Sequence, residues 1–356
     1  MKRIFELDKE QERRALDLHK EATIIDSSIV MNPDGKGLAN GEYFKTLIDA
    51  GITASFDMRP FTSWDATQQA MKNLYKWYRL IEKYPDKIVL ANDAEDIVEA
   101  KRNKKWVYVA GLQSPEPIQN DLTTLPILYK LGIRVMLIAY NKRNYLGDGC
   151  LERGNSGLSD FGLKAIEEMN RLGILIDLAH SNDATTSEAI EASKDPTIFS
   201  HANPRSICPH RRNKTDEQIK AMAEKGGVIG IVPFAPFTEV KKGVRPTFED
   251  YLYHMEYAIK LVGVDHVGMG QDLLDPWYFS PQEYVGHVGR EPEIWQAPGG
   301  LMYDYSTRRI DNFDKIEDTI NLTKGLVAKG YSDEEIKKIL GQNLLRVLRK
   351  VWKKKK

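Results

Sequence analysis

Polar side chains that could do chemistry follow several short apolar runs in this sequence. His180 ends the run GILIDLAH, His201 follows the apolar start of the run TIFSHAN, and Asp272 lies near the end of HVGMGQDL. Two imidazoles and a carboxylate are ordinary ligands of zinc, which turns a bound water into a nucleophile near neutral pH. The three residues therefore predict a divalent-metal centre. The alternative for each histidine is a structural role, in which the imidazole only forms hydrogen bonds at the end of its strand.

Other runs also end in polar residues, and these widen the set of candidates. Gln113 is a possible metal ligand, Tyr140 a possible catalytic group and Asn141 a possible substrate-binding amide. An earlier run ends with Asp57 and Arg59.

Cys150 stands in the glycine-rich loop GDGCLERGNSG, which could present a thiolate as a nucleophile or a soft metal ligand. An inert buried cysteine is the commoner situation. Cys208 in SICPH and Glu116 in QSPEP are weaker candidates for the same kinds of role.

A repeated alternation of strand and helix must position these residues. Near-continuous apolar runs of this length are typical of parallel strands covered on both faces. Eight such units predict an α/β fold, a (β/α)8 TIM barrel whose functional residues lie at the carboxyl ends of the strands. An open doubly wound sheet is the alternative, but the sequence has no glycine-rich phosphate loop for it. The eight runs are Thr23–Met31, Ile52–Arg59, Val107–Ser114, Arg134–Asn141, Gly173–His180, Thr197–Asn203, Gly227–Phe234 and His266–Leu273.

Segments with helical spacing separate the runs. Ser159 and Thr215 are suitable N-caps for two of them. Ser332 and Glu335 have the spacing of a capping box at the start of a closing helical segment, residues 332–355. The expected helices between the runs are Trp64–Lys83, Leu122–Leu131, Ser159–Leu172, Asp183–Ser193, Asp216–Lys225 and Phe248–Val262.

One stretch, residues 275–312, breaks this alternation and is rich in Pro, Gly, Trp and Tyr. Because it follows the last strand, we expect it beside the mouth of the barrel as a lid or a dimer contact. We expect residues 1–356 to form one barrel domain, since a chain with 42% hydrophobic residues can build one large core.

Composition limits the partners of the protein. The 51 basic and 51 acidic residues cancel, so bulk charge does not favour nucleic acid. No run of about 18 apolar residues predicts a membrane span, and the charged N-terminus lacks the apolar stretch of a secretion signal. Two cysteines are too few for a disulfide framework, which predicts a cytoplasmic setting. These features favour a small-molecule substrate.

Four ordered motifs make the chain resemble the membrane (renal) dipeptidase family. Leu158–Ile190 is similar to the family pattern LT-FG…MN-LG-DLSH, and Phe199–Ile231 to its SH, H-RN-D and Gly-Gly-Val elements. Val267–Leu274 stands where the family has GIGSDFDG, and Gly341–Val347 is similar to its closing segment. The resemblance covers almost the whole chain and implies an amidohydrolase-like TIM barrel.

The resemblance implies a zinc-dependent dipeptidase with two metals bridged by one glutamate, in a homodimer. By position, His180 and His201 match two histidines of the second metal, and Asp272 matches the acid that handles the proton. Arg212 matches the arginine that clamps the substrate carboxylate, a task that suits a guanidinium fork. A surface-loop ion pair is the alternative for Arg212.

Three departures from the family pattern narrow this expectation and indicate a divergent bacterial or archaeal member. The family's H-x-D metal pair falls on Ser28 and Val30, and its bridging glutamate falls on Gln113. A further family histidine falls on Tyr140. We therefore expect one zinc ion at most, because two imidazoles alone make an incomplete shell. Asp272, the oxygen of Gln113 or Cys150 could complete it.

Three functions remain compatible with these residues. The first is hydrolysis of an amide or peptide C–N bond in a small carboxylate-bearing substrate such as a dipeptide. The second is a different, metal-independent enzyme acting on an amino-acid derivative through Cys150, Tyr140 or Asp272. The third is an inactive ligand-binding homologue.

Overall fold

The computed structural model describes residues 5–274 and 291–352, and its parallel strands form the predicted TIM-like barrel. Each of the eight predicted runs contains one strand of the ring or, for the last run, two short ones. The short strand β3 (Ile88–Leu90) pairs with β4 outside this ring. In their order around the barrel, the strands are β1 (Ile24–Val30), β2 (Ile52–Arg59), β4 (Trp106–Leu112), β5 (Val135–Leu137), β6 (Leu175–Asp177), β7 (Ile198–Phe199), β8 (Val228–Ile231), β9 (Val267–Met269) and β10 (Leu273–Leu274).

The eighth strand position is divided into two short pieces. β9 pairs with β8 and β10 pairs with β1, so the two pieces together close the ring. Asp272 lies at the break with a φ of 49°, and its N–H donates to the carbonyl of Ser28 at 2.8 Å. The break therefore gives Asp272 a backbone direction that a continuous strand would not allow.

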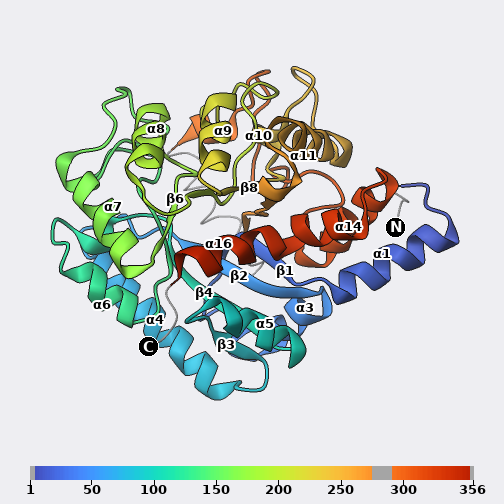
Figure 1. Ribbon diagram of the computed structural model, residues 1–356, viewed down its shortest axis with the longest axis horizontal. Coiled ribbons are helices and arrows are strands. Elements are labelled where there is room, and N and C mark those ends of the chain that lie inside the picture. The colour runs from blue at the N-terminus through green and yellow to red at the C-terminus, as the bar shows by residue number, and fades with distance from the viewer. Residues whose placement is uncertain (1–4, 275–290, 353–356) are drawn as a thin grey trace.

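Helices surround the strands (Figure 1), and all six that we predicted between the runs are present. Ser159, Thr215 and Ser332 each accept a bond from the backbone N–H three residues later, as predicted. The helices are α1 (Lys9–Glu21), α2 (Lys36–Ala39), α3 (Glu42–Asp49), α4 (Ala66–Lys83), α5 (Ala94–Arg102), α6 (Thr124–Lys130), α7 (Asp160–Leu172), α8 (Asp183–Ala192), α9 (Asp216–Glu224), α10 (Ala235–Thr238), α11 (Phe248–Val262), α13 (Pro292–Trp295), α14 (Thr319–Ala328), α15 (Asp333–Lys337) and α16 (Asn343–Val351). Shorter turns are η1 (Glu116–Ile118), η2 (Val264–His266), η3 (Ile316–Asp318) and the π-helical η4 (Lys338–Gln342).

Helix α16 closes the amino end of the barrel, and Figure 1 shows it lying across the strands. Asn343 donates to the carbonyls of Val264 and Val267, at the start of β9. Trp352, just beyond the helix, donates to the carbonyl of Arg134, which precedes β5. This end is therefore sealed, and the opposite end carries the polar residues of the predicted site.

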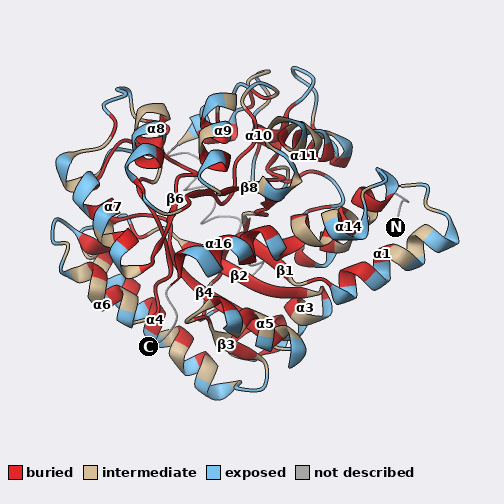
Figure 2. Ribbon diagram, in the orientation of Figure 1, coloured by how far each residue is buried: buried red, intermediate tan, exposed pale blue. Residues whose placement is uncertain are grey.

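Small residues allow the strands to converge inside the barrel. A Cβ atom on Gly230 or Gly270 would lie 2.1 or 1.9 Å from the carbonyl oxygen of Ser200. Ser27 lies in the same space and donates to the carbonyls of Ser200 and Met269, at 2.5 and 2.8 Å. Figure 2 shows that the strands are buried along their lengths. Close packing of this kind leaves little room for error in side-chain volume.

Only the second part of the predicted insertion can be placed, because residues 275–290 lie outside the described residues. The remainder packs at the mouth of the barrel. Trp295 meets Phe234 edge to face at 5.2 Å, in a buried apolar cluster that also contains Cys150. Across the described ranges, no helix is long and apolar enough to span a membrane.

Candidate active site

The carboxyl ends of neighbouring strands bring most of the predicted site residues to the mouth of the barrel. Gln113 directly follows β4, His201 follows β7 by one residue, and Asp272 lies at the break in the eighth strand. Tyr140 and Asn141 follow β5, and His180 follows β6. The candidate side chains are therefore positioned by the ends of the strands, and not by loops far from the barrel.

The two histidines form the centre of this group. Their Nε2 atoms are 2.9 Å apart, and the rings meet edge to face with centroids 4.9 Å apart. Nε2 of Gln113 lies 3.4 Å from Nε2 of His201. Both imidazoles are at least 94% buried, since His180 is 6% exposed and His201 is fully buried.

Hydrogen bonds at the other ring nitrogens set the direction of each imidazole. His180 Nδ1 lies 2.7 Å from the amide oxygen of Asn141. His201 Nδ1 lies 2.7 Å from Oγ of Ser200, whose hydroxyl donates to the carboxylate of Asp177. Each Nδ1 is thus a donor, which leaves the two Nε2 atoms as lone-pair acceptors facing one another. Two facing lone pairs are repulsive unless a cation lies between them.

Electrostatics disfavour a proton as that cation. Burial lowers the pKa of His201 to about 3, with the charges of Arg212 and Lys214 acting in the same direction and that of Asp272 opposing it. Burial and Arg212 also hold the pKa of His180 well below its ordinary value. Both imidazoles are therefore neutral near pH 7, which is the form that binds a metal ion.

The donor set does not fit a two-metal centre. The positions of the missing H-x-D pair hold Ser28, whose hydroxyl lies 3.3 Å from the Asp272 carboxylate, and Val30, which has no donor atom. Within residues 5–274 and 291–352, no three His, Cys, Asp or Glu side chains are grouped to hold a metal. One ion between His180 and His201 is the most that the residues could hold. His180 and His201 would hold such an ion through their Nε2 atoms.

Asp272 is the predicted acid–base carboxylate, and it lies in the barrel mouth at the break in the eighth strand. It is partly exposed and adopts the left-handed backbone region, which is uncommon for residues other than glycine and is found at functional sites. Its side chain contacts Ser28, and its charge raises the pKa of His201. The backbone of the divided strand therefore presents a carboxylate toward the histidine pair.

Arg212 lies beneath the histidines rather than in an ion pair of the described chain. Its guanidinium donates to the carbonyls of Ala179 and His201 and is 1% exposed, while its Nε has no partner among the described residues. Its planar group lies 5.2 Å from the ring of Phe237. The arginine thus links the ends of β6 and β7, and its predicted contact with a substrate carboxylate stays a prediction.

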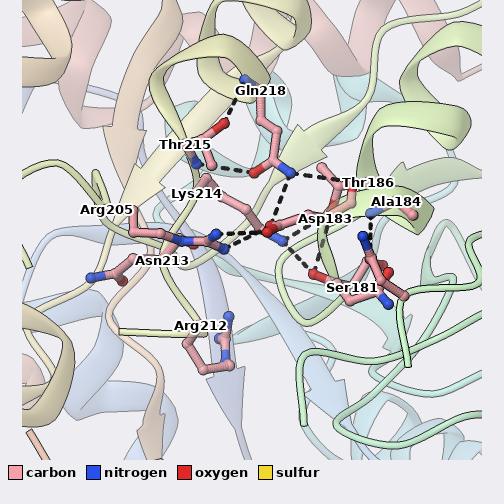
Figure 3. Close-up of polar contacts among 12 residues, drawn as sticks. Ser181, Asp183, Ala184, Thr186, Arg205, Arg212, Asn213, Lys214, Thr215 and Gln218 are labelled. Carbon is pink, nitrogen blue, oxygen red and sulfur yellow. Dashed lines mark hydrogen bonds and ion pairs between the residues drawn. The ribbon is translucent and has the colours of Figure 1, made fainter. Parts of the chain in front are cut away.

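A second buried cation, Lys214, follows two residues later. Its ammonium donates to the carbonyl of Ser181 at 2.8 Å and to Oγ1 of Thr186 at 3.2 Å, as Figure 3 shows. Burial lowers its pKa to about 7, and Arg212 adds to this shift. In the same view, Arg205 and Gln218 both donate to Asp183, whose charge opposes the lowering of the Lys214 pKa. Lys214 therefore supports the loop that follows His180.

Tyr140 and Cys150 flank the histidine pair. The Tyr140 ring stacks on His180 at 4.5 Å, and burial raises the pKa of its hydroxyl. Cys150 Sγ lies 3.5 Å from the amide oxygen of Asn141, and burial raises the pKa of the thiol. A protonated thiol is a weak nucleophile, so the structure gives no support for Cys150 as the leading group.

The remaining candidates make contacts away from the histidine pair. Asp57 accepts from Trp77 and from the backbone of Met31, both at 3.0 Å. Cys208 is buried against the carbonyl of Pro236 at 3.6 Å. Arg59 donates to Asn73 at 3.2 Å, and Glu116 lies in η1, beyond the end of β4.

Four residues of the site were missed by sequence reasoning. Asp177 and Ser200 orient His201, Lys214 supports the loop after His180, and Glu291 accepts from the amide of Asn141. Asp177 and Ser200 could have been found, because each is a polar residue inside an apolar run directly before a histidine motif. Nothing in the sequence distinguishes Lys214 from the other basic residues of HRRNK.

Comparison with known families gives one match that covers most of the chain. Residues 35–291 and 299–356 match the family model described as membrane dipeptidase, peptidase family M19.

Relatives with dipeptidase names are similar to much of the chain. Dipeptidase tcpJ of Claviceps purpurea is 26% identical over 275 residues, which is 77% of this chain and 57% of that protein. An uncharacterized dipeptidase of Schizosaccharomyces pombe is 29% identical over 281 residues, 78% of this chain and 60% of that protein. The chain therefore spans less than two thirds of the length of either relative.

Solved structures share the fold over nearly the full chain. An amidohydrolase from Pseudomonas aeruginosa is 30% identical, with a TM-score of 0.81, and the match covers 95% of this chain and 99% of the other. The probable dipeptidase PvdM from the same organism is 19% identical, with a TM-score of 0.79 over 97% and 99% of the two chains. The chain therefore has the same fold as these two proteins over nearly its whole length.

Proposed function

The chain belongs to the membrane dipeptidase family, peptidase family M19, and from this premise we propose that it hydrolyses the C–N bond of a small carboxylate-bearing amide such as a dipeptide. The observation that carries the proposal is the pair of neutral imidazoles whose Nε2 atoms face each other 2.9 Å apart at the mouth of the barrel. The family is one of metallopeptidases, and two neutral imidazoles are ordinary ligands of zinc, which supports a metal-dependent reaction at this pair.

We propose that this pair binds at most one divalent ion, with the side chain of Gln113 as a third donor. Gln113 lies close enough to His201 to contribute, and its amide can turn its oxygen toward an ion. Zinc suits two neutral imidazoles. A bound ion would supply Lewis-acid polarisation of the scissile carbonyl.

The residues of the chain would carry the proton and hold the substrate. Asp272 would take a proton from the attacking water as the C–O bond forms, and would return it to the amine as the C–N bond breaks. Arg212 would hold the carboxylate of the substrate through its guanidinium. Tyr140 and the described part of the insertion, from Glu291 onward, would restrict water around the reacting bond.

The test is a panel of L-L and L-D dipeptides assayed with metal-depleted and zinc-loaded protein. We expect turnover that depends on zinc and falls by about 10²-fold to 10⁴-fold in Asp272→Asn, as for loss of a general acid–base group. Asp86→Asn makes the same change at an exposed position on the surface and serves as the control.

The outcomes also separate the alternative functions. Turnover that survives chelation and falls in Cys150→Ser would favour the metal-independent enzyme. Ligand-induced thermal stabilisation with no turnover of any dipeptide, under any divalent metal, would sink the hydrolase and favour a binding protein.

A further inference from the structure

A cavity of about 850 Å³ lies at the amino end of the barrel, away from the histidine pair. It is bordered by the end of α1, the turn from α3 into β2, the turn from α5 into β4, and the start of α14. Figure 1 shows these helices gathered on one side of the molecule. Its volume is in the range of small-molecule sites. We call it the basal cavity.

Cations dominate the wall of the basal cavity. One of its two carboxylates, Asp49, is already paired with Lys45. The other is Glu317. The five lysine and arginine residues of the wall are Lys20, Lys101, Arg102, Lys104 and Lys105.

Most of these cations have no protein partner among the described residues. Lys105 donates to the carbonyl of Pro85, but no hydrogen bond or ion pair within residues 5–274 and 291–352 involves the side chains of Lys20, Lys101, Arg102 or Lys104. Lys101 is only partly exposed, and burial lowers the pKa of its ammonium. The partly buried ammonium of Lys101 loses hydration without gaining a counter-charge, and an anion in the cavity would offset that cost. Lys20, Arg102 and Lys104 are exposed and free to turn toward such an anion.

Lys104 provides a second, independent observation. It lies two residues after α5, just beyond the C-cap Asn103, with a φ of 53°, and the N–H of Lys105 donates to the carbonyl of Ala100 at 2.9 Å. This is the position at which helices usually have glycine, because a Cβ atom is strained there. The chain carries a long cationic side chain at this position and directs it to the rim of the cavity.

The floor of the basal cavity is apolar. Leu16, Ile48, Ile52 and Ile320 contribute to it, and Leu16 is 50% exposed. A wall of cations beside an apolar floor matches a ligand that has an anionic group and a flat or aliphatic body.

We propose that the basal cavity binds a small phosphate ester with an apolar body, the chemistry of a mononucleotide. Basic side chains supply charge-assisted bonds to phosphate oxygens, and the isoleucines and Leu16 contact the body. The ligand is not the substrate of the histidine pair. β4 lies between Lys105 at the cavity and Gln113 at the mouth, and these two residues are separated by about 26 Å of extended chain. This proposal is independent of the hydrolase activity.

Calorimetric titration of the full-length protein with AMP, and separately with inorganic pyrophosphate, tests the proposal. We expect AMP to bind more tightly than pyrophosphate, because only AMP uses the apolar floor. Arg102→Glu/Lys104→Glu should weaken AMP binding at least about tenfold, as expected for loss of two charge-assisted contacts. Lys164→Glu/Lys220→Glu makes the same change in charge on the exposed faces of α7 and α9 and should leave AMP binding unchanged.

Lys104→Gly keeps the proposal testable if the charge reversals disturb folding. It relieves the left-handed strain, so it should raise the melting temperature of the free protein while weakening AMP binding. No heat of AMP binding at millimolar concentration would overturn the proposal. Equal affinity for AMP and pyrophosphate, or equal AMP affinity in both double variants, would also overturn it.

Discussion

At the scale of single residues, the orientation of His201 depends on groups that lie behind it. Ser200 accepts from Nδ1 of His201 and donates its hydroxyl to Asp177, so the ring cannot turn without breaking a buried hydrogen bond to a hydroxyl that is itself held in place. Asn141 performs the same task for His180. Partners of this kind raise the basicity of a ligand and fix its tautomer. Both histidines of the candidate site are thus held in one orientation by buried partners.

Gln113 offers the sharpest test at this scale. Gln113→Glu places a carboxylate at the position where the family has its bridging glutamate, and we expect it to raise zinc affinity at least about tenfold. Gln113 is 4% exposed, so the added charge should destabilise the metal-free protein by a few kcal/mol and zinc should restore the loss. Zinc titration followed by thermal unfolding measures both effects.

Gln113→Ala is the matched comparison for that substitution, because it removes the amide without adding charge. It should bind zinc no more tightly than the unaltered protein. Equal zinc affinity in Gln113→Glu and Gln113→Ala would show that position 113 does not face the ion, and would contradict the proposed donor set.

At the scale of elements, the divided eighth strand brings β9 against the interior of the barrel. Gly270→Ala would place a Cβ atom 1.9 Å from the carbonyl oxygen of Ser200, which is main chain and cannot give way. We expect a loss of roughly 2–3 kcal/mol of unfolding free energy, as for overpacking of a core. Urea denaturation measures it. Gly268→Ala, within β9 two residues earlier, meets a side-chain methyl group of Val228 at 3.3 Å and should cost less than about 1 kcal/mol. Equal losses would mean that the interior is loosely packed.

The elements also show which parts of the fold could be predicted. The strands were predictable because their apolar runs are continuous, and the start of α9 because Thr215 is a suitable N-cap; the structure adds Gln218 as the second member of a capping box. Helix α1 was not, since its buried Ala15 and Leu18 lie among charged residues and only tertiary packing reveals them. The gap at residues 270–272 was missed, although its glycine and aspartate are both disfavoured in strands, because the apolar run continues on either side of it.

The candidate site was predictable to a smaller extent. Position in a repeated unit identified His180 and His201, since strand ends of a barrel converge whatever their sequence. The buried cation Lys214 and the contact from Glu291 to Asn141 join segments that are distant in the sequence. Such contacts follow from the closed barrel and not from any local pattern.

At the scale of the whole molecule, burial keeps several histidines neutral in the folded state. The pKa of His210 and of His254 is lowered by burial to about 3, as is that of His201. An unfolded histidine titrates near its ordinary value of about 6.5. Between these values the unfolded chain binds protons that the folded chain does not, so each of these groups makes the protein less stable as the pH falls below about 6.5.

His254 isolates this contribution, because it is fully buried in α11, outside the candidate site. Among the described residues, its ring has one hydrogen-bond partner, the carbonyl of Thr238 at 3.3 Å. His254→Gln should reduce the pH dependence of the unfolding free energy between pH 4 and 6 by about 1.4 kcal/mol per pH unit. His254→Leu should show the same reduced slope. The unfolding free energies of the two variants should differ at pH 7.5, because glutamine can still donate to the carbonyl of Thr238 and leucine cannot. Unfolding in urea across this pH range measures the slopes, and a slope equal to that of the unaltered protein would mean that His254 is protonated in the fold.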